Sequence, residues 1–236
     1  MLLSLSIDLF SAIIDIEKKT ALNKDWSIEM YKTFGKRLID IVVSIISLPI
    51  FGILLVVLAP IIKVTDKGPI FYNAERLGRK GKVYKMFKFR SMKVNAPDIR
   101  NEDGSTFNGN NDPRVTKIGR IMRKTSLDET PQILNVLKGD MSLIGPRPFV
   151  TTHYYGYEKL DDKGKKRLEV RPGITGYSQA YYRNSIEQKQ KIENDCFYAD
   201  HVSFHLDVKI FLHTIKTVLK RENIYVDKTE SKLRKD

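Results

Sequence analysis

The feature that most restricts how this chain can fold is an uncharged apolar run from Ile41 to Ile62. As a helix, its 22 residues would reach roughly 33 Å, which is enough to cross the hydrocarbon core of a bilayer. Pro49 stands inside the run, and a proline there removes a backbone hydrogen bond and clashes with the preceding turn. The run therefore predicts a membrane helix that is kinked or broken at Pro49.

Two membrane arrangements fit this run. Basic residues flank both of its ends, and Lys and Arg are enriched on cytoplasmic flanks, so both ends can lie on one side, as in a re-entrant helix. The alternative, which these features leave equally open, is a kinked helix that spans the membrane. A buried helix of a soluble protein is disfavoured. The flanking residues are Lys32, Lys36 and Arg37 before the run and Lys63 and Lys67 after it.

The charge of the chain indicates an anionic partner. A formal net charge of +13 is typical of proteins that bind nucleic acid, anionic lipid or a phosphorylated substrate. The single cysteine, Cys196, excludes an internal disulfide and a cysteine-based metal cluster. The sequence has no P-loop, dinucleotide-binding fingerprint or His-Glu-x-x-His motif. It also has no RNA-type aromatic platform, so we expect no nucleic-acid partner.

A second basic segment, residues 76–93, contains no acidic residue. Within it, residues 83–90 alternate loosely between apolar and polar types after two glycines, which predicts a strand that follows a hairpin turn. One interpretation is a basic surface that faces the membrane. The other is that Lys88 and Arg90 hold a pyrophosphate through charge-assisted hydrogen bonds.

Two adjacent carboxylates, Asp128 and Glu129, lie where a helix is expected to begin. Residues 126–129 read Ser-Leu-Asp-Glu and match a capping box, in which the Ser and Glu side chains satisfy free amide groups. Pro131 is a competing start signal. On this pattern alone, capping is the favoured role for Glu129. The positive end of the helix would stabilise both carboxylates and the oxygens of an incoming phosphate.

Downstream, residues 145–148 read Gly-Pro-Arg-Pro. The two prolines fix the backbone around Arg147, so its planar guanidinium can be held in one place for a phosphate.

The chain divides into four expected segments. Residues 1–29 are an N-terminal extension or a start-site artefact, 30–65 a basic flank with the membrane helix, 66–225 the main domain and 226–236 a polar tail. Near the end of the main domain, an expected helix over residues 206–221 can lie in the membrane interface, although packing against the core is commoner. Its apolar stripe consists of Val208, Phe211, Leu212, Ile215 and Leu219.

Several sequence motifs, and the order in which they follow one another along the chain, resemble those of the bacterial sugar transferase family, the small monotopic phosphoglycosyl transferases. The resemblance implies an α+β, mainly helical fold with a re-entrant membrane helix broken at Pro49, near Ser47. It also implies a compact catalytic domain over residues 66–225 with interfacial amphipathic helices, at the cytoplasmic face of the bacterial inner membrane. The motifs occupy residues 36–40, 84–92, 126–129, 135–142, 145–148 and 171–176.

The resemblance further implies transfer of a sugar 1-phosphate from a UDP-sugar to polyprenyl (undecaprenyl) phosphate, with release of UMP and with Mg²⁺ as cofactor. Asp128 would be the nucleophile that forms an aspartyl phosphosugar, and Glu129 its acidic partner, both as ligands of the metal. Phosphate and substrate groups would be bound by Lys88, Arg90, Arg147, Arg171 and Asp195.

Such a reaction would be the first membrane step of a surface polysaccharide or glycoconjugate pathway, such as capsule, exopolysaccharide or lipopolysaccharide synthesis. The expected partners are the UDP-sugar, the polyprenyl phosphate, membrane lipids and downstream glycosyltransferases. The sequence indicates neither the sugar nor the oligomeric state. The alternative function is a noncatalytic, membrane-anchored basic binding module.

Overall fold

The structure is mostly helical, with two small sheets, as the sequence predicts. It is a computed structural model that describes residues 26–97, 99, 109, 112–150, 156–183 and 185–220. The first 25 residues of the expected extension and the whole expected tail lie outside the described residues. The boundaries of the four expected segments remain predictions. In chain order the elements are η1 (Tyr31–Gly35), α2 (Lys36–Asp66), β1 (Phe71–Leu77), η2 (Arg79–Gly81), β2 (Val83–Phe89), α3 (Lys117–Thr125), η3 (Leu127–Glu129), α4 (Gln132–Lys138), β3 (Ser142–Ile144), β4 (Phe149–Val150), η4 (Tyr157–Lys159), α5 (Asp162–Lys166), η5 (Arg167–Glu169), β5 (Gly173–Thr175), α6 (Tyr177–Tyr181), α7 (Gln188–Asp200) and α8 (Phe204–Lys220).

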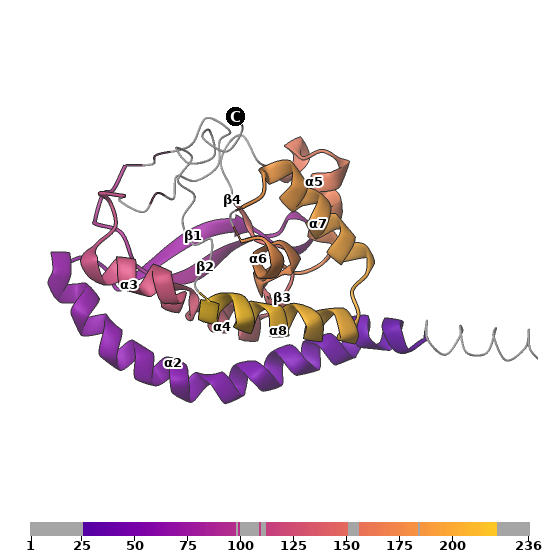
Figure 1. Ribbon diagram of the computed structural model, residues 1–236, viewed down its shortest axis with the longest axis horizontal. Helices are drawn as coiled ribbons and strands as arrows, with labels where there is room; N and C mark the ends of the chain where they lie inside the picture. The colour runs from indigo at the N-terminus through magenta and orange to yellow at the C-terminus, as the bar shows by residue number, and fades with distance from the viewer. Residues whose placement is uncertain are drawn as a thin grey trace, which may run out of the picture.

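Helix α2 contains the apolar run and curves as one long arc beneath the rest of the chain (Figure 1). It continues through Pro49 and Pro60 and is not divided into two helices. The hydroxyl of Ser47 donates to the carbonyl of Val43 at 2.8 Å, and such bonds, like prolines, bend helices without ending them. The helical segment Trp26–Asp66 is long and apolar enough to cross a membrane, and 11% of its 18-residue apolar window is buried. A re-entrant course stays a prediction.

The predicted basic strand is β2, and it pairs with β1 in an antiparallel hairpin. The register places Ala74 opposite Met86 and Arg76 opposite Tyr84. Because side chains alternate between the two faces of a strand, Arg76, Met86 and Lys88 lie on the same face. Strand β4 extends this sheet in the order β2-β1-β4, and β3 and β5 form a separate parallel pair.

Polar side chains near the start of α2 attach this helix to the domain. Arg37 donates to the carbonyls of Val136 at 2.6 Å and Leu137 at 3.0 Å, in the last turn of α4. A cation in this position satisfies the free carbonyl groups of a helix end. Asp40 accepts a hydrogen bond of 3.1 Å from the Ser142 hydroxyl and one of 2.9 Å from the next main-chain amide. Helix α2 is therefore bound to both α4 and β3.

Arg90 binds the C-terminal end of α2. Its guanidinium contacts the Asp66 carboxylate at 2.6 Å. It also donates to the main-chain carbonyls of Ile62, Pro69 and Met92. These bonds tie the last turn of the helix to the segments on either side of the β1–β2 hairpin.

The apolar stripe of α8 points outward. On the opposite side of the helix, Asp207 and Ile210 are buried. The expectation that this stripe packs in the core is therefore wrong, and the membrane-interface alternative remains. In Figure 1, α8 and α2 both lie along the lower side of the molecule. The exposed side chains of the stripe are Val208, Phe211, Leu212, Ile215 and Leu219.

We predict that Arg90→Met lowers the free energy of unfolding by about 2 kcal/mol, because Asp66 and three carbonyls lose a charged donor. Denaturant unfolding in detergent measures the change. Lys82→Met removes an exposed cation from the turn of the adjacent β1–β2 hairpin and should leave stability unchanged. Equal stability of the two variants would contradict the structural role of Arg90.

Candidate active site

Asp128 and Glu129 lie on the short turn η3 between α3 and α4. Helix α3 ends at Thr125, and the next residue, Ser126, has a left-handed backbone with a φ of 59°. The Ser126 side chain makes no capping hydrogen bond, and α4 begins directly after Pro131, which has helical dihedral angles. The capping-box prediction is therefore wrong. The left-handed residue turns the chain, and the next helix begins at Gln132, with Pro131 at its N-cap, one residue before the first helical position that the competing signal predicts.

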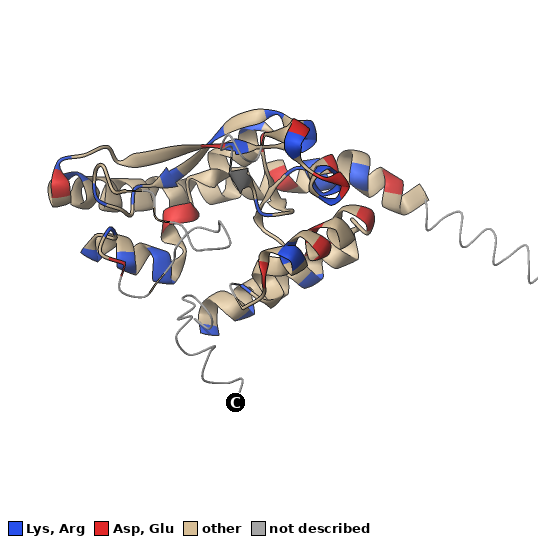
Figure 2. Ribbon diagram, turned by 90° about the horizontal axis from the view of Figure 1, so that it is seen from above, with Lys and Arg blue, Asp and Glu red and all other residues tan. Residues whose placement is uncertain are grey.

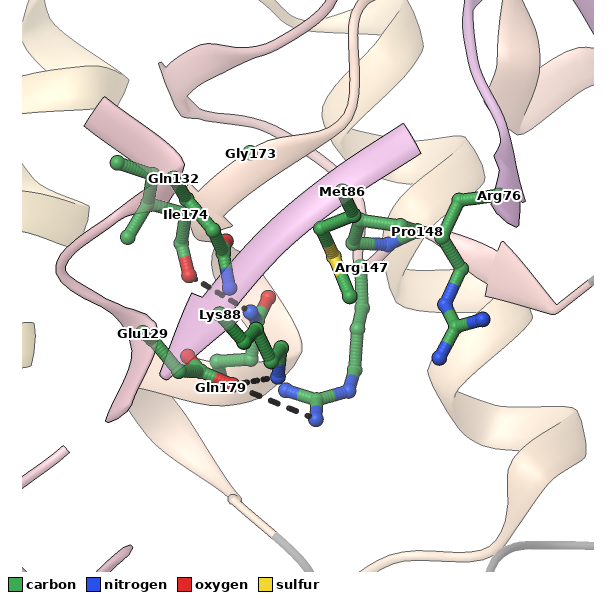
Figure 3. A pocket seen from close by; sticks show the side chains of 10 residues that line it. All are labelled: Arg76, Met86, Lys88, Glu129, Gln132, Arg147, Pro148, Gly173, Ile174 and Gln179. Carbon is green, nitrogen blue, oxygen red and sulfur yellow. Dashed lines mark hydrogen bonds and ion pairs between the residues drawn. The ribbon is translucent and has the colours of Figure 1, made fainter. Parts of the chain in front are cut away.

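Glu129 is the centre of a charged cluster (Figure 3). Lys88 Nζ donates to Glu129 Oε1 at 2.5 Å, and the Arg147 guanidinium lies 3.8 Å from the same oxygen. Burial raises the pKa of Glu129, but the charges of Lys88 and Arg147 and the hydrogen bond from Lys88 outweigh it and lower the pKa to about 2. Glu129 is therefore ionised at neutral pH and holds two cations in place.

Asp128 is buried beside this cluster. Burial raises the pKa of its carboxyl group, and the negative charge of Glu129 raises it further. The charges of Lys88 and Arg123 oppose both effects. Adjacent carboxylates in one site thus differ: Glu129 is strongly paired, whereas Asp128 lies within reach of the cations without forming an ion pair with another described residue.

A cavity of about 90 Å³ opens next to Glu129. Lys and Arg are spread over many elements of the structure (Figure 2), yet three of them, Arg76, Lys88 and Arg147, line this one cavity. The cavity is large enough to admit a phosphate group. Three cations facing one ionised carboxylate leave the cavity positive, which favours binding of a phosphate.

Sequence reasoning missed three of the residues that line the cavity: Arg76, Gln132 and Gln179. Figure 3 shows Arg76 on the opposite side of Arg147 from Glu129. The strand alternation could have found it, because the hairpin places Arg76 on the same face as Lys88. The two glutamines gave no signal, since their approach depends on how α4 and α6 pack.

Two cations that the sequence predicts at the site bind other groups of the protein. Arg90 binds the end of α2, so it does not join Lys88 at Glu129. Arg171 donates to the carbonyl of Gly139 at 3.0 Å, just after α4, and does not line the cavity. Burial lowers the pKa of Arg171, and the nearby charge of Arg37 lowers it further.

Asp195 is also outside the cavity. It is buried on α7 and pairs with Arg167. Burial raises its pKa to about 6, although the charges of Arg167 and Arg147 oppose this shift. The structure therefore brings together Asp128, Glu129, Lys88 and Arg147 from the expected set, whereas Asp195 pairs with Arg167 outside the cavity.

The described residues contain no group of three or more His, Cys, Asp or Glu side chains that could hold a metal ion. Mg²⁺, however, usually binds through one or two carboxylates together with waters and substrate phosphates. The carboxylate oxygens of Glu129, which lines the positive cavity, and of the adjacent Asp128 fit that requirement. Both residues thus remain candidate ligands.

An exposed apolar helix bound to a domain with a cationic, carboxylate-containing cavity defines a class: membrane-associated proteins that handle phosphate groups. The sequence profile of one family, described as bacterial sugar transferase, matches residues 31–221. The chain belongs to the bacterial sugar transferase family, as its motifs predict.

Three similar proteins show how far the likeness extends. Galactosyl transferase CpsE of Streptococcus agalactiae serotype III (strain NEM316) is 42% identical over 82% of this chain and 45% of its own length. Undecaprenyl-phosphate galactose phosphotransferase of Salmonella typhimurium (strain LT2) is 41% identical over 81% and 42%. UDP-glucose:undecaprenyl-phosphate glucose-1-phosphate transferase of Klebsiella pneumoniae is 42% identical over 76% and 39%. The chain spans less than half the length of these relatives.

We predict that Lys88→Met raises the pKa of Glu129 from about 2 toward its ordinary value of 4.5, because burial is then opposed by fewer charges. In the native protein, stabilisation by ionised Glu129 is complete above pH 4.5 and is lost as the pH falls toward 2. The variant should lose it at higher pH. Carboxyl ¹³C NMR titration measures the pKa, and Lys85→Met, on the other face of β2, is the control. An unchanged pKa in Lys88→Met would contradict the pairing.

Proposed function

We propose that this protein transfers a sugar 1-phosphate from a UDP-sugar to polyprenyl phosphate, specifically undecaprenyl phosphate, and releases UMP. The observation that carries the proposal is the buried Asp128 directly before ionised Glu129, which lines a positive cavity together with Lys88 and Arg147. The printed names of the Salmonella and Klebsiella relatives, which combine a sugar donor with undecaprenyl phosphate, support the same reaction class.

The reaction proceeds in two displacements at one phosphorus atom. A carboxylate oxygen of Asp128 attacks the phosphorus that bears the sugar. The bond to the bridging oxygen breaks, UMP leaves with that oxygen and its electron pair, and an aspartyl phosphosugar remains. An oxygen of polyprenyl phosphate then attacks the same phosphorus. The bond to Asp128 breaks, which restores the carboxylate and yields the polyprenyl diphosphosugar.

The surrounding side chains supply charge and orientation, which carry most of the catalysis in phosphoryl transfer. Lys88 and Arg147 bind the oxygens of the transferred phosphoryl group, and Glu129 holds both cations at the correct place. Arg123, whose Nε donates to the Ser91 hydroxyl at 3.0 Å, favours the ionised, nucleophilic form of Asp128. Mg²⁺ held by Asp128 and Glu129 would neutralise further phosphate charge.

Helix α2 is proposed to be re-entrant, with the domain on the cytoplasmic face of the bacterial inner membrane. Basic flanks at both ends of the apolar run favour a common side, and both ends of the arc in Figure 1 rise toward the domain. The exposed apolar stripe of α8 would lie in the same interface. A shallow position brings the cavity to the headgroup level, where a polyprenyl phosphate presents its phosphate.

The product would supply downstream glycosyltransferases of a surface polysaccharide or glycoconjugate pathway. The second candidate function is a noncatalytic, membrane-anchored basic binding module, favoured only by the +13 net charge and the exposed apolar helix.

We predict that Asp128→Asn reduces UMP release by about 10⁴-fold or more, because the nucleophile is lost. Assays of purified protein with a panel of UDP-sugars and undecaprenyl phosphate measure the rate, and mass spectrometry of quenched protein should find the phosphosugar on Asp128. Asp200→Asn removes an exposed carboxylate that pairs with Lys166 and should retain activity. A silent Asp128→Asn would favour the binding module instead.

We predict that cysteines placed at positions 33 and 65 are labelled from the same side of the membrane. Each replaces a threonine in a Cys196→Ser background, and a membrane-impermeant maleimide is applied to inverted and right-side-out vesicles. Labelling from opposite sides would establish a spanning helix and exclude the re-entrant course.

A further inference from the structure

A buried ion pair lies next to the Gly-Pro-Arg-Pro loop. Asp195 on α7 contacts Arg167 at the start of η5, and their side chains are 2% and 3% exposed. Burying two charges costs so much desolvation that replacing such a pair by apolar residues is often neutral or stabilising. Stability alone is therefore a weak reason for this pair to be present.

Arg167 connects the pair to the cavity. The terminal nitrogen that contacts Asp195 also donates to the main-chain carbonyl of Arg147 at 2.6 Å. The side chain of Arg147 lies 3.8 Å from Glu129. A continuous series of contacts thus runs from a buried carboxylate on α7, through two arginines, to the charged cluster.

The loop is held at three points of its main chain. Two hydrogen bonds of 2.9 Å attach Gly145 and Pro146 to strand β5. The third is the bond from Arg167. The side chain of Arg147 is 58% exposed, so surrounding side chains restrict it little. The position of this side chain therefore depends on the main chain of Arg147. Arg167 fixes the carbonyl of that residue, which stands between two prolines.

We propose that Asp195 and Arg167 are positioning residues: they hold the Arg147 main chain so that its guanidinium meets the transferred phosphate beside Glu129. The proposal rests on the function proposed above. Asp195 orients Arg167 and neutralises its buried charge. It acts through Arg147 instead of making the substrate contact that the sequence predicts for it.

The first test replaces the pair as a unit. Arg167→Met with Asp195→Leu removes both charges at similar volume, so the melting temperature should stay near that of the native protein. The kcat/KM for UMP release should fall about 10- to 100-fold, as expected when a group at the reacting centre is misplaced. Glu193→Gln is the matched control, because Glu193 also lies on α7 and pairs with α5 through Lys163 at 2.9 Å, but at the surface.

The second test asks whether the pair acts through Arg147. In an Arg147→Ala background, the same double replacement should lower kcat/KM by less than about twofold, because the group that it positions is already gone. An equal fall in both backgrounds would overturn the proposal. Arg167→Lys keeps one donor and should retain more activity than Arg167→Met. If the apolar pair does not fold, the cycle is run with Arg167→Lys.

A third measurement separates this inference from the proposed reaction. Calorimetry of inorganic pyrophosphate binding needs no turnover, and Arg147→Ala should weaken it about tenfold. Replacing the pair should weaken it similarly, with no further loss when the two changes are combined. Native protein that binds pyrophosphate in this way but releases no UMP would refute the reaction and leave the positioning role intact. Independent losses would refute the positioning role.

Discussion

The attachment of α2 to the domain by charged side chains is the constraint on which the site depends. Most of the apolar surface of α2 is exposed, so polar contacts near its two ends add to the apolar packing of Phe51, Leu58 and Ile62 in the core. Arg37 and Asp40 bind α4 and β3, and α4 follows Glu129 while β3 leads to Arg147. Arg90 binds the far end of the helix. A helix suited to lipid is therefore joined to the two segments that adjoin Glu129 and Arg147 in the chain.

Neighbouring charges stabilise the two adjacent carboxylates to different extents. Glu129 meets Lys88 at 2.5 Å, and a carboxylate paired so closely is a poor nucleophile but a good anchor. Asp128 is buried, and its pKa is raised rather than lowered. Its negative charge is less stabilised by its neighbours, so it gains more from forming a bond to an electrophilic phosphorus. One residue of the pair is suited to organise cations and the other to react.

How much the sequence could predict is clear from particular residues. Alternation and glycines predicted the β1–β2 hairpin, because strand periodicity is local. Lys88 and Arg90 looked equivalent, but β2 ends at Phe89, and Arg90 turns to Asp66 instead of the cavity. The capping box failed because Ser126 adopts a left-handed backbone that no spacing rule reveals. Only the family resemblance predicted that Lys88, Glu129 and Arg147 meet at one site. Their meeting depends on tertiary packing, which brings together segments that are distant in sequence.

The cations of the cavity bear on the order of events in the proposed reaction. Both substrates present phosphate groups, and Lys88 and Arg147 line the cavity where these groups would bind. A direct transfer would need both phosphate groups beside these cations at once. With a covalent intermediate on Asp128, UMP would leave before the lipid phosphate enters, so the same cations would serve both displacements.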